Sequence, residues 1–328
     1  MSDFEAPLHV STGTLPDRDR VAALVVEAHD RYRDTHDGQC SQVYPALAAA
    51  DPSLYGLCLL STAGTVHCAG DSDVRFALMS LAKPFVLALV CELVGAETVR
   101  QAIGLNATGA PFNSVEAVER APGGRTNPMV NAGAIATIGL VPGSSVDDKW
   151  AFMLDGLSRF VGRPLELDDD VYRSVAATNH RNRALGNLLH SLGALETDPD
   201  EAVELYTRQS CLSVDAGDLA GAGATLANGG VQPITGERVV EASVCHGVMA
   251  TMATAGLYDT SGDWLWDIGL PGKSGIGGGI VAVSPGKGAL GVFSPPLDTA
   301  GNSVRGQLAA AFLSKALGLD LFATTPSG

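Results

Sequence analysis

Ser80 and Lys83 are the first residues of this chain whose types and spacing suggest chemistry. They stand three positions apart at the start of a predicted helix over 80–94, which places both side chains on one helix face. The serine would be a nucleophile and the lysine its base, because the positive end of a helix favours loss of the lysine proton. The simpler interpretation is an N-cap serine and a solvated lysine. In a second copy, Ser284–Lys287, an intervening Pro-Gly predicts a turn that does not bring the side chains together.

The glycine-rich segment 271–279 contains Lys273-Ser-Gly. It does not match a phosphate-binding loop, because Asp267 stands where such a loop needs glycine, and Ile280 breaks the dinucleotide-binding pattern. Two interpretations remain open. The segment is either a strand so tightly packed that only glycine fits, or the strand that lines the active site of acyl-transfer enzymes with Ser-x-x-Lys. In the second case a backbone N–H at the strand edge would stabilise an oxyanion.

Three further polar side chains have both a structural and a chemical interpretation. Asn131 follows Asn127-Pro-Met-Val and begins an apolar segment, as is typical of a helix start. Tyr206 and Tyr258 are isolated tyrosines in apolar neighbourhoods, which favours amphipathic core positions. With its hydroxyl against a Ser–Lys pair, a tyrosine would instead relay protons. The seven histidines form no zinc-protease motif, and the chain has no Gly-x-Ser-x-Gly, so an α/β-hydrolase is not predicted.

The composition indicates a compact globular protein and excludes several partners. Hydrophobic residues make up 46% of the 328 residues and charged residues 17%, which a folded core accounts for. The net charge of −15 is the wrong sign for binding nucleic acid or an anionic membrane surface. No uncharged apolar run reaches the length of a membrane span, and the N-terminus does not resemble a signal peptide. We therefore expect a soluble cytoplasmic protein.

The cysteine pattern supports the same expectation. None of the six cysteines stands in Cys-x-x-Cys spacing, and most lie in apolar runs. This predicts buried thiols in a reducing compartment and neither disulfides nor zinc ligands.

The periodicity predicts strands at both ends of the chain and helices between them. Helices are expected over 17–34, 80–94, 148–161, 182–192, 200–211, 215–227, 241–253 and 302–317, and strands over 55–61, 65–69, 74–76, 279–284 and 289–294. Strands that pair across such a distance imply an α/β fold of the α+β type, with one mixed sheet built from both chain ends. We predict a tail over 1–17 and a single domain over 18–328, whose sheet comes from about 18–78 and 256–328 and whose helical part spans about 79–255.

Together these motifs resemble the serine-dependent glutaminase family. The matching segments, in order, are Pro111-Phe-Asn113-Ser, Asn127-Pro-Met-Val-Asn131-Ala-Gly-Ala, Gly256-Leu-Tyr258-Asp, Gly269-Leu-Pro-Gly-Lys273-Ser-Gly-Ile-Gly-Gly-Gly-Ile and Ser294-Pro-Pro-Leu-Asp298, after Ser80-x-x-Lys83. The resemblance runs from about residue 38 to residue 317. It implies a β-lactamase/transpeptidase-like fold and amide hydrolysis through an acyl-enzyme, with no metal or cofactor.

The resemblance also implies a role for individual residues. Ser80 matches the nucleophile and Lys83 its activator, while Tyr206 and Tyr258 match two tyrosines of which one or both move protons. The backbone N–H groups of Ser80 and Ile276 match the oxyanion hole. Asn131 and Asn182 match asparagines that contact the substrate.

Three positions depart from the family pattern, and all three concern substrate recognition. A tyrosine is replaced by Val43, with Tyr44 one place later, and the glutamine before the nucleophile is replaced by Met79. A glutamate expected to pair with the α-ammonium of glutamine is replaced by Val175. Loss of a partner to a buried charge typically costs about 3–5 kcal/mol.

The sequence therefore leaves three functional hypotheses. The first is a glutaminase that converts L-glutamine to L-glutamate and ammonia. The second is an amidase or acyl-transferase of the same fold for a different amide, such as one without an α-amino group. The third is a non-catalytic binding homologue. The expected partner is a small-molecule amide, and the resemblance implies a homodimer or homotetramer.

Overall fold

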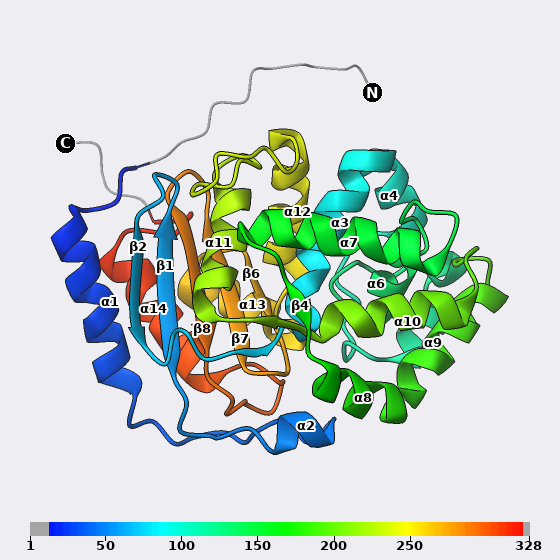
Figure 1. Cartoon of the computed structure of the whole chain (residues 1–328), viewed down its shortest axis with the longest axis horizontal. Helices are drawn as coiled ribbons and strands as arrows, with labels where there is room; N and C mark the ends of the chain where they lie inside the picture. The colour runs from blue at the N-terminus through cyan, green and yellow to red at the C-terminus, as the bar shows by residue number, and fades with distance from the viewer. Residues whose placement is uncertain (1–12, 324–328) are drawn as a thin grey trace.

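The computed structural model describes residues 13–323, and its main sheet is built from both ends of this range (Figure 1). Its five strands run in the order β2-β1-β8-β7-β6. Their bounds are β1 Gly56–Ser61, β2 Val66–Gly70, β6 Gly272–Ser274, β7 Gly279–Ser284 and β8 Gly288–Phe293. The predicted pairing of early and late strands is thus confirmed, with β1 beside β8. The N-terminal part of the predicted tail, residues 1–12, and the last five residues of the predicted domain lie outside the described residues.

The main sheet is antiparallel in every pairing, so the prediction of a mixed sheet was wrong in that respect. Tight hairpins join β1 to β2 and β7 to β8, and a hairpin imposes antiparallel pairing. A second, small antiparallel sheet has the order β3-β5-β4, from β3 Phe76–Ala77, β4 Glu166–Leu167 and β5 Leu212–Val214. Its short strands β4 and β5 lie inside the part of the chain predicted to be helical.

Helices cover both faces of the main sheet. On one face lie α1 Arg18–Tyr32, α13 Ser261–Ile268 and α14 Val304–Ala316, and on the other lies α11 Ala216–Ala227. One hydrophobic core lies on each face of the sheet, and strand β1 contributes to both. Leu57 and Leu59 pack in the core under α1, α13 and α14, while Cys58 and Leu60 pack in the core on the α11 side. Successive strand residues point to opposite faces, so one strand serves two cores.

The remaining helices form the second half of the molecule. They are α2 Pro45–Ala48, α3 Ala82–Val94, α4 Ala96–Ile103, α5 Val115–Arg120, α6 Asn131–Ile138, α7 Val146–Val161, α8 Asp169–Thr178, α9 His180–Ser191, α10 Pro199–Ser210 and α12 Ala242–Ala255, with 3-10 turns η1 Met79–Leu81 and η2 Pro122–Gly124. A third 3-10 turn, η3 Tyr258–Thr260, contacts α13 and belongs to the sheet half. The predicted helices are all present within a few residues. The short helices α4, α5, α8 and α13 were not predicted.

Helix α3 is the apolar centre of this half and packs against α4, α6, α7 and α12. Its residues from Ala82 to Cys91 are all buried. Among residues 13–323 no single helix is long and apolar enough to cross a membrane; the sharply bent pair Met79–Val94 and Ala96–Ile103 passes that test by length and composition only.

The cysteine prediction needs one correction. Cys58 and Cys68 form a disulfide between β1 and β2. The two residues face each other directly in the strand register, with their Cα atoms 4.1 Å apart. The sequence predicted the hairpin but not its register, which decides which side chains meet. The other four cysteines are free thiols, and Cys91, Cys211 and Cys245 are buried as expected.

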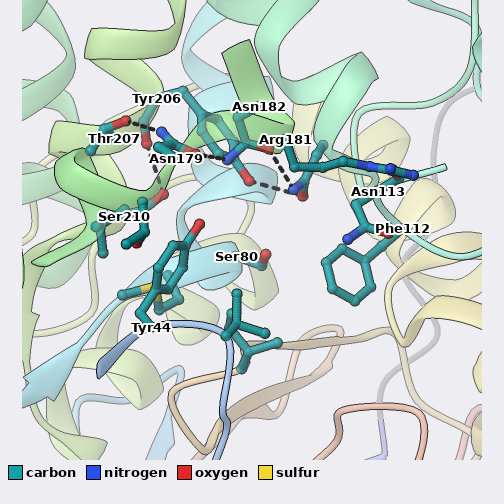
Figure 2. A pocket seen from close by; sticks show the side chains of 16 residues that line it. Tyr44, Ser80, Phe112, Asn113, Asn179, Arg181, Asn182, Tyr206, Thr207 and Ser210 are labelled. Carbon is teal, nitrogen blue, oxygen red and sulfur yellow. Dashed lines mark hydrogen bonds between the residues drawn. The ribbon is translucent and has the colours of Figure 1, made fainter. Parts of the chain in front are cut away.

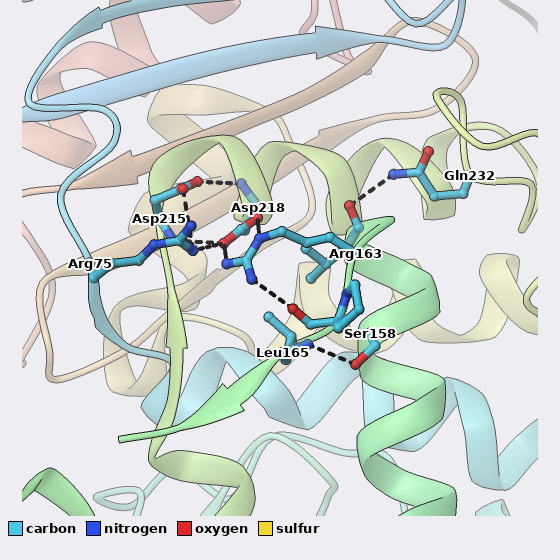
Figure 3. A network of polar contacts seen from close by, with 9 residues as sticks. Arg75, Ser158, Arg163, Leu165, Asp215, Asp218 and Gln232 are labelled. Carbon is cyan, nitrogen blue, oxygen red and sulfur yellow. Dashed lines mark hydrogen bonds and ion pairs between the residues drawn. The ribbon is translucent and has the colours of Figure 1, made fainter. Parts of the chain in front are cut away.

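An ion-pair network ties the chain just before β3 to α11 and to the end of α7 (Figure 3). The Asp218 carboxylate accepts hydrogen bonds from Arg75 and Arg163, both at 2.8 Å. Asp218 also belongs to the capping box of α11, in which Asp215 accepts its backbone N–H. This carboxylate therefore fixes the strand that leads into Ser80.

We predict that Asp218→Ala lowers the free energy of unfolding by about 2–4 kcal/mol, because two guanidinium groups and a helix start lose their shared acceptor. Asp170→Ala is the control. Its carboxylate pairs with Arg173 on the surface, where both side chains are exposed, and the expected loss is less than about 1 kcal/mol. Urea unfolding of both variants measures the difference, and equal losses would contradict a special role for Asp218.

Candidate active site

Ser80 lies in the turn η1, between β3 and α3, where the two halves of the molecule meet. The residue before it, Met79, has φ of 49°, in the left-handed region that non-glycine residues rarely adopt. Such strained backbone is typical of functional sites. Ser80 is 8% exposed, and its side chain lines a cavity. The turn thus presents the Ser80 hydroxyl to the cavity, while its neighbour Leu81 is buried in the apolar core.

Lys83 projects from the first turn of α3 and contacts Ser80 directly. Its Nζ donates to Ser80 Oγ at 3.0 Å and to Asn131 Oδ1 at 2.7 Å. The side chain is 2% exposed, and burial lowers the pKa of Lys83 to about 7. A substantial fraction is therefore neutral at physiological pH. The sequence attributed this neutrality to the helix terminus, whereas the structure attributes it to burial among apolar helices.

Tyr206 and Tyr258 approach Ser80 from opposite halves of the molecule. Tyr206 comes from α10, and its hydroxyl donates to Asn131 Oδ1 at 3.0 Å. Tyr258 comes from η3, and its hydroxyl donates to the Ser274 carbonyl at 3.2 Å. Burial raises the pKa of Tyr258 to about 12 and that of Tyr206 well above its usual value, and each phenol lies near the Ser80 hydroxyl. Both are therefore protonated at neutral pH and act as hydrogen-bond donors.

Two backbone N–H groups are free to bind an oxyanion. Ile276 follows β6 and lines the cavity together with Ser80. Among the hydrogen bonds of residues 13–323, none is donated by the backbone N–H of either residue. Gly279 lets the glycine-rich segment pack closely against the turn that carries Ser80, because a Cβ at this position would lie 2.4 Å from the Leu81 side chain. The interpretation of the glycine-rich segment as a tightly packed strand is thus compatible with its interpretation as an active-site wall.

A chain of neutral side chains leads from Lys83 along the cavity wall (Figure 2). Asn131 Nδ2 donates to Asn182 Oδ1 at 2.9 Å, Asn182 Nδ2 donates to Asn179 Oδ1 at 2.6 Å, and Asn179 Nδ2 donates to Thr207 Oγ1 at 2.7 Å. These residues come from α6, α9 and α10 and the residue before α9. Their amides are held in fixed orientations because each is hydrogen-bonded to the next.

The cavity itself has a volume of about 90 Å³ and is lined by Ser80 and Ile276 and by all four remaining residues that were predicted to contact substrate, Asn131, Asn182, Met79 and Val175. Val175 is buried, and it packs in an apolar cluster with Met79. The structure brings the predicted residues together, and their individual roles stay predictions.

Tyr44 was not predicted as a site residue, yet Tyr44 and not Val43 is the side chain that reaches into the cavity. Val43 stands at the mouth of the cavity and is 55% exposed. Tyr44 lines the cavity and points its hydroxyl into it (Figure 2). Burial raises the pKa of Tyr44, so it is a neutral phenol. The tyrosine one place late in sequence is the one that faces the site.

Phe112, Asn179 and Arg181 also line the cavity and were not predicted to do so. Phe112 stacks at a tilt on Tyr258, with ring centroids 4.6 Å apart. Arg181 precedes Asn182, and its Nε donates to the Asn113 carbonyl at 2.9 Å. The nearness of Phe112 to the matched Asn113, and of Arg181 to Asn182, was the only signal in the sequence.

The model of the family described as Glutaminase matches residues 38–322 of this chain. The chain belongs to the glutaminase family. It is 58% identical to Glutaminase 2 of Yersinia pestis over 97% of this chain and 94% of that protein. It is 48% identical to a glutaminase of Brucella canis over 88% of this chain and 90% of that protein.

Solved structures agree with this glutaminase assignment. The structure of a protein described as the probable glutaminase ybaS superposes with a TM-score of 0.93 at 43% identity, covering 94% of this chain and all of that one. A probable glutaminase from Bacillus subtilis, complexed with 6-diazo-5-oxo-L-norleucine, superposes with a TM-score of 0.84 at 29% identity, covering 95% and 99%. The expected β-lactamase/transpeptidase-like fold is therefore confirmed.

We predict that the activity of this glutaminase is lost as Lys83 becomes protonated. Because the pKa of Lys83 is about 7, kcat/KM falls about tenfold per pH unit below that value and levels off above it. The measurement is kcat/KM from pH 5 to pH 9. Lys83→Arg, which stays charged, should lose at least about a hundredfold at every pH. A profile that is flat through pH 7, or an active arginine variant, would contradict the role of Lys83 as base.

Proposed function

We propose that this chain hydrolyses L-glutamine to L-glutamate and ammonia through an acyl-enzyme on Ser80. The family and the named glutaminases support this reaction. The observation that carries the mechanism is the 3.0 Å hydrogen bond between Ser80 Oγ and the buried Nζ of Lys83. The comparisons do not favour the two alternatives, a different amidase or acyl-transferase and a non-catalytic homologue.

In the first half-reaction, neutral Lys83 takes the proton of the Ser80 hydroxyl as its oxygen attacks the amide carbon of glutamine. The backbone N–H groups of Ser80 and Ile276 receive the negative charge on the amide oxygen. Collapse of the tetrahedral intermediate breaks the C–N bond, and the leaving nitrogen takes up a proton and departs as ammonia. Tyr258 is placed to deliver that proton, because it lies near the Ser80 hydroxyl as a protonated phenol.

The second half-reaction uses the same groups in reverse. Water attacks the ester carbon on Ser80 and its proton passes to the Tyr258 phenolate, while Lys83 still holds the proton taken from Ser80 and the oxyanion again lies between the two N–H groups. Release of the γ-carboxylate returns the proton to Ser80. Asn131 supports both steps, because its Oδ1 accepts from Lys83 and Tyr206 and so keeps both side chains directed at Ser80.

We further propose that the protein works in the cytoplasm as a homodimer or homotetramer. The four free cysteines support a reducing compartment, whereas the Cys58–Cys68 disulfide is an exception to it. The side chain of Trp266 on α13 is 90% exposed and would be covered by assembly.

We predict that Ser80→Ala abolishes ammonia release from glutamine while the protein remains folded. Intact-mass and peptide analysis should find a single adduct of 6-diazo-5-oxo-L-norleucine on Ser80. The control is Ser284→Ala, the serine of the second Ser-x-x-Lys, whose hydroxyl donates to the Leu319 carbonyl away from the cavity. That variant should retain activity and labelling. Labelling of a different residue, or activity in Ser80→Ala, would exclude Ser80 as the nucleophile.

For the assembly, light scattering coupled to gel filtration should give a mass of two or four times 33.7 kDa. A mass of a single chain at micromolar concentration would contradict the proposed oligomer. Such a result would leave the proposed reaction untouched, because every residue placed at Ser80 belongs to one chain.

A further inference from the structure

The cavity beside Ser80 lacks negative charge. Its described lining residues include four asparagines, two serines and two threonines, but neither aspartate nor glutamate. The one charged side chain among them is the cation Arg181. Behind the wall, Lys83 and Lys273 are both buried next to the site, and burial lowers the pKa of each amine, so neither adds a negative charge. Within this lining the electrostatic environment of a bound substrate is therefore neutral to positive, whereas the adjoining pocket, which shares Val43, Phe112 and Ile276, contains the carboxylates of Asp37 and Asp298.

The amide carbon of glutamine must reach Ser80, so the rest of the molecule extends along the wall. Part of that wall is apolar, because Val175 is 2% exposed and packs with Met79, Leu47 and Cys211. The polar part is neutral: the asparagine amides are bonded to one another, and Tyr44 is a protonated phenol. The nearby carboxylate Glu204 is already bonded to Tyr172 and Arg208 and lies outside the lining.

These surroundings treat the two charged groups of glutamine differently. A carboxylate finds an exposed guanidinium at Arg181, whose Nε alone is bonded, to Asn113. An ammonium finds dipoles but no opposite charge in this lining, and the one charged side chain there, Arg181, has the same sign as the ammonium. Removing an ammonium from water without a counter-ion is costly. The α-amino group of glutamine therefore contributes nothing favourable to binding at neutral pH.

We propose that this site recognises ω-amides of five-carbon dicarboxylic acids by their amide and carboxylate, and that it hydrolyses those without an α-ammonium at least as efficiently as glutamine. The substrate class comprises glutaramate and glutamines whose α-nitrogen is acylated. Val175 is the residue that determines this specificity, because it supplies a buried apolar surface inside the cavity. The inference rests on the proposed acyl-enzyme at Ser80 and leaves glutamine as a substrate.

The test compares glutaramate with L-glutamine on the same preparation of wild-type enzyme, by ammonia release at pH 7. The expected kcat/KM for glutaramate equals or exceeds that for glutamine, and a lower value overturns the inference. Failure to hydrolyse either amide would instead refute the proposed function. The two failures are thus distinguishable, because activity on glutamine alone leaves the acyl-enzyme mechanism intact.

The pH dependence of the same comparison gives a second readout without any substitution. Both amides depend equally on Lys83 and on the other titratable groups that face the cavity, Tyr44, Tyr206 and Tyr258, so these effects cancel in the ratio. As pH rises toward the pKa of the α-amino group, glutamine loses its positive charge. Its kcat/KM should therefore rise relative to that of glutaramate. A fall in this ratio would show that the ammonium is recognised and would overturn the inference.

Two matched variants test Val175 itself. Val175→Glu adds a carboxylate to the wall and should raise the ratio of kcat/KM for glutamine over glutaramate at least tenfold. Val175→Gln has the same size without the charge and should leave the ratio within threefold of wild type. Because both substrates are measured on one preparation, partial misfolding does not alter the ratio. Equal shifts in both variants would remove Val175 as the specificity-determining residue.

Discussion

The burial of the Lys83 side chain is the constraint on which the rest of this structure depends. An ammonium that is excluded from water and has only the Ser80 hydroxyl and the Asn131 carbonyl as hydrogen-bond acceptors is poorly stabilised in its charged form. Its pKa therefore falls to about 7. This makes the amine a base strong enough to take a proton from serine and still neutral in a useful fraction of molecules.

The exclusion of water from the Lys83 side chain depends on the packing of the helices around α3. Helix α3, from which Lys83 projects, is enclosed by α4, α6, α7 and α12. The same helices deliver the polar groups: α6 carries Asn131, and α10, packed on α6, carries Tyr206. The sheet half contributes Tyr258 and the N–H of Ile276. The site thus exists only where the two halves meet, and the strained residues Met79 and Tyr258 both lie at that junction.

Chemistry and recognition are separable in this molecule. The groups that surround the Ser80 hydroxyl are the ones expected of a serine acyl-transfer centre, and each is fixed by hydrogen bonds or burial. The wall that faces the remainder of the substrate is built differently, with Val175 buried and Tyr44 turned inward in place of Val43. Such a division lets the substrate range change while the reaction at the amide stays the same, because the two sets of residues come from different elements.

The sequence by itself determined the main elements and the family, and it predicted the reacting residues. Local patterns sufficed for these, since Ser80 and Lys83 share a helix face by spacing and the β1–β2 and β7–β8 hairpins follow from alternation and turn residues. Only the tertiary structure decided which side chains meet. Local patterns did not give the register that joins Cys58 to Cys68. The antiparallel pairing of β1 with β8 and the inward turn of Tyr44 depend on contacts between segments distant in sequence. The low pKa of Lys83 has the same origin, because desolvation is produced by the surrounding helices and not by its neighbours in the chain.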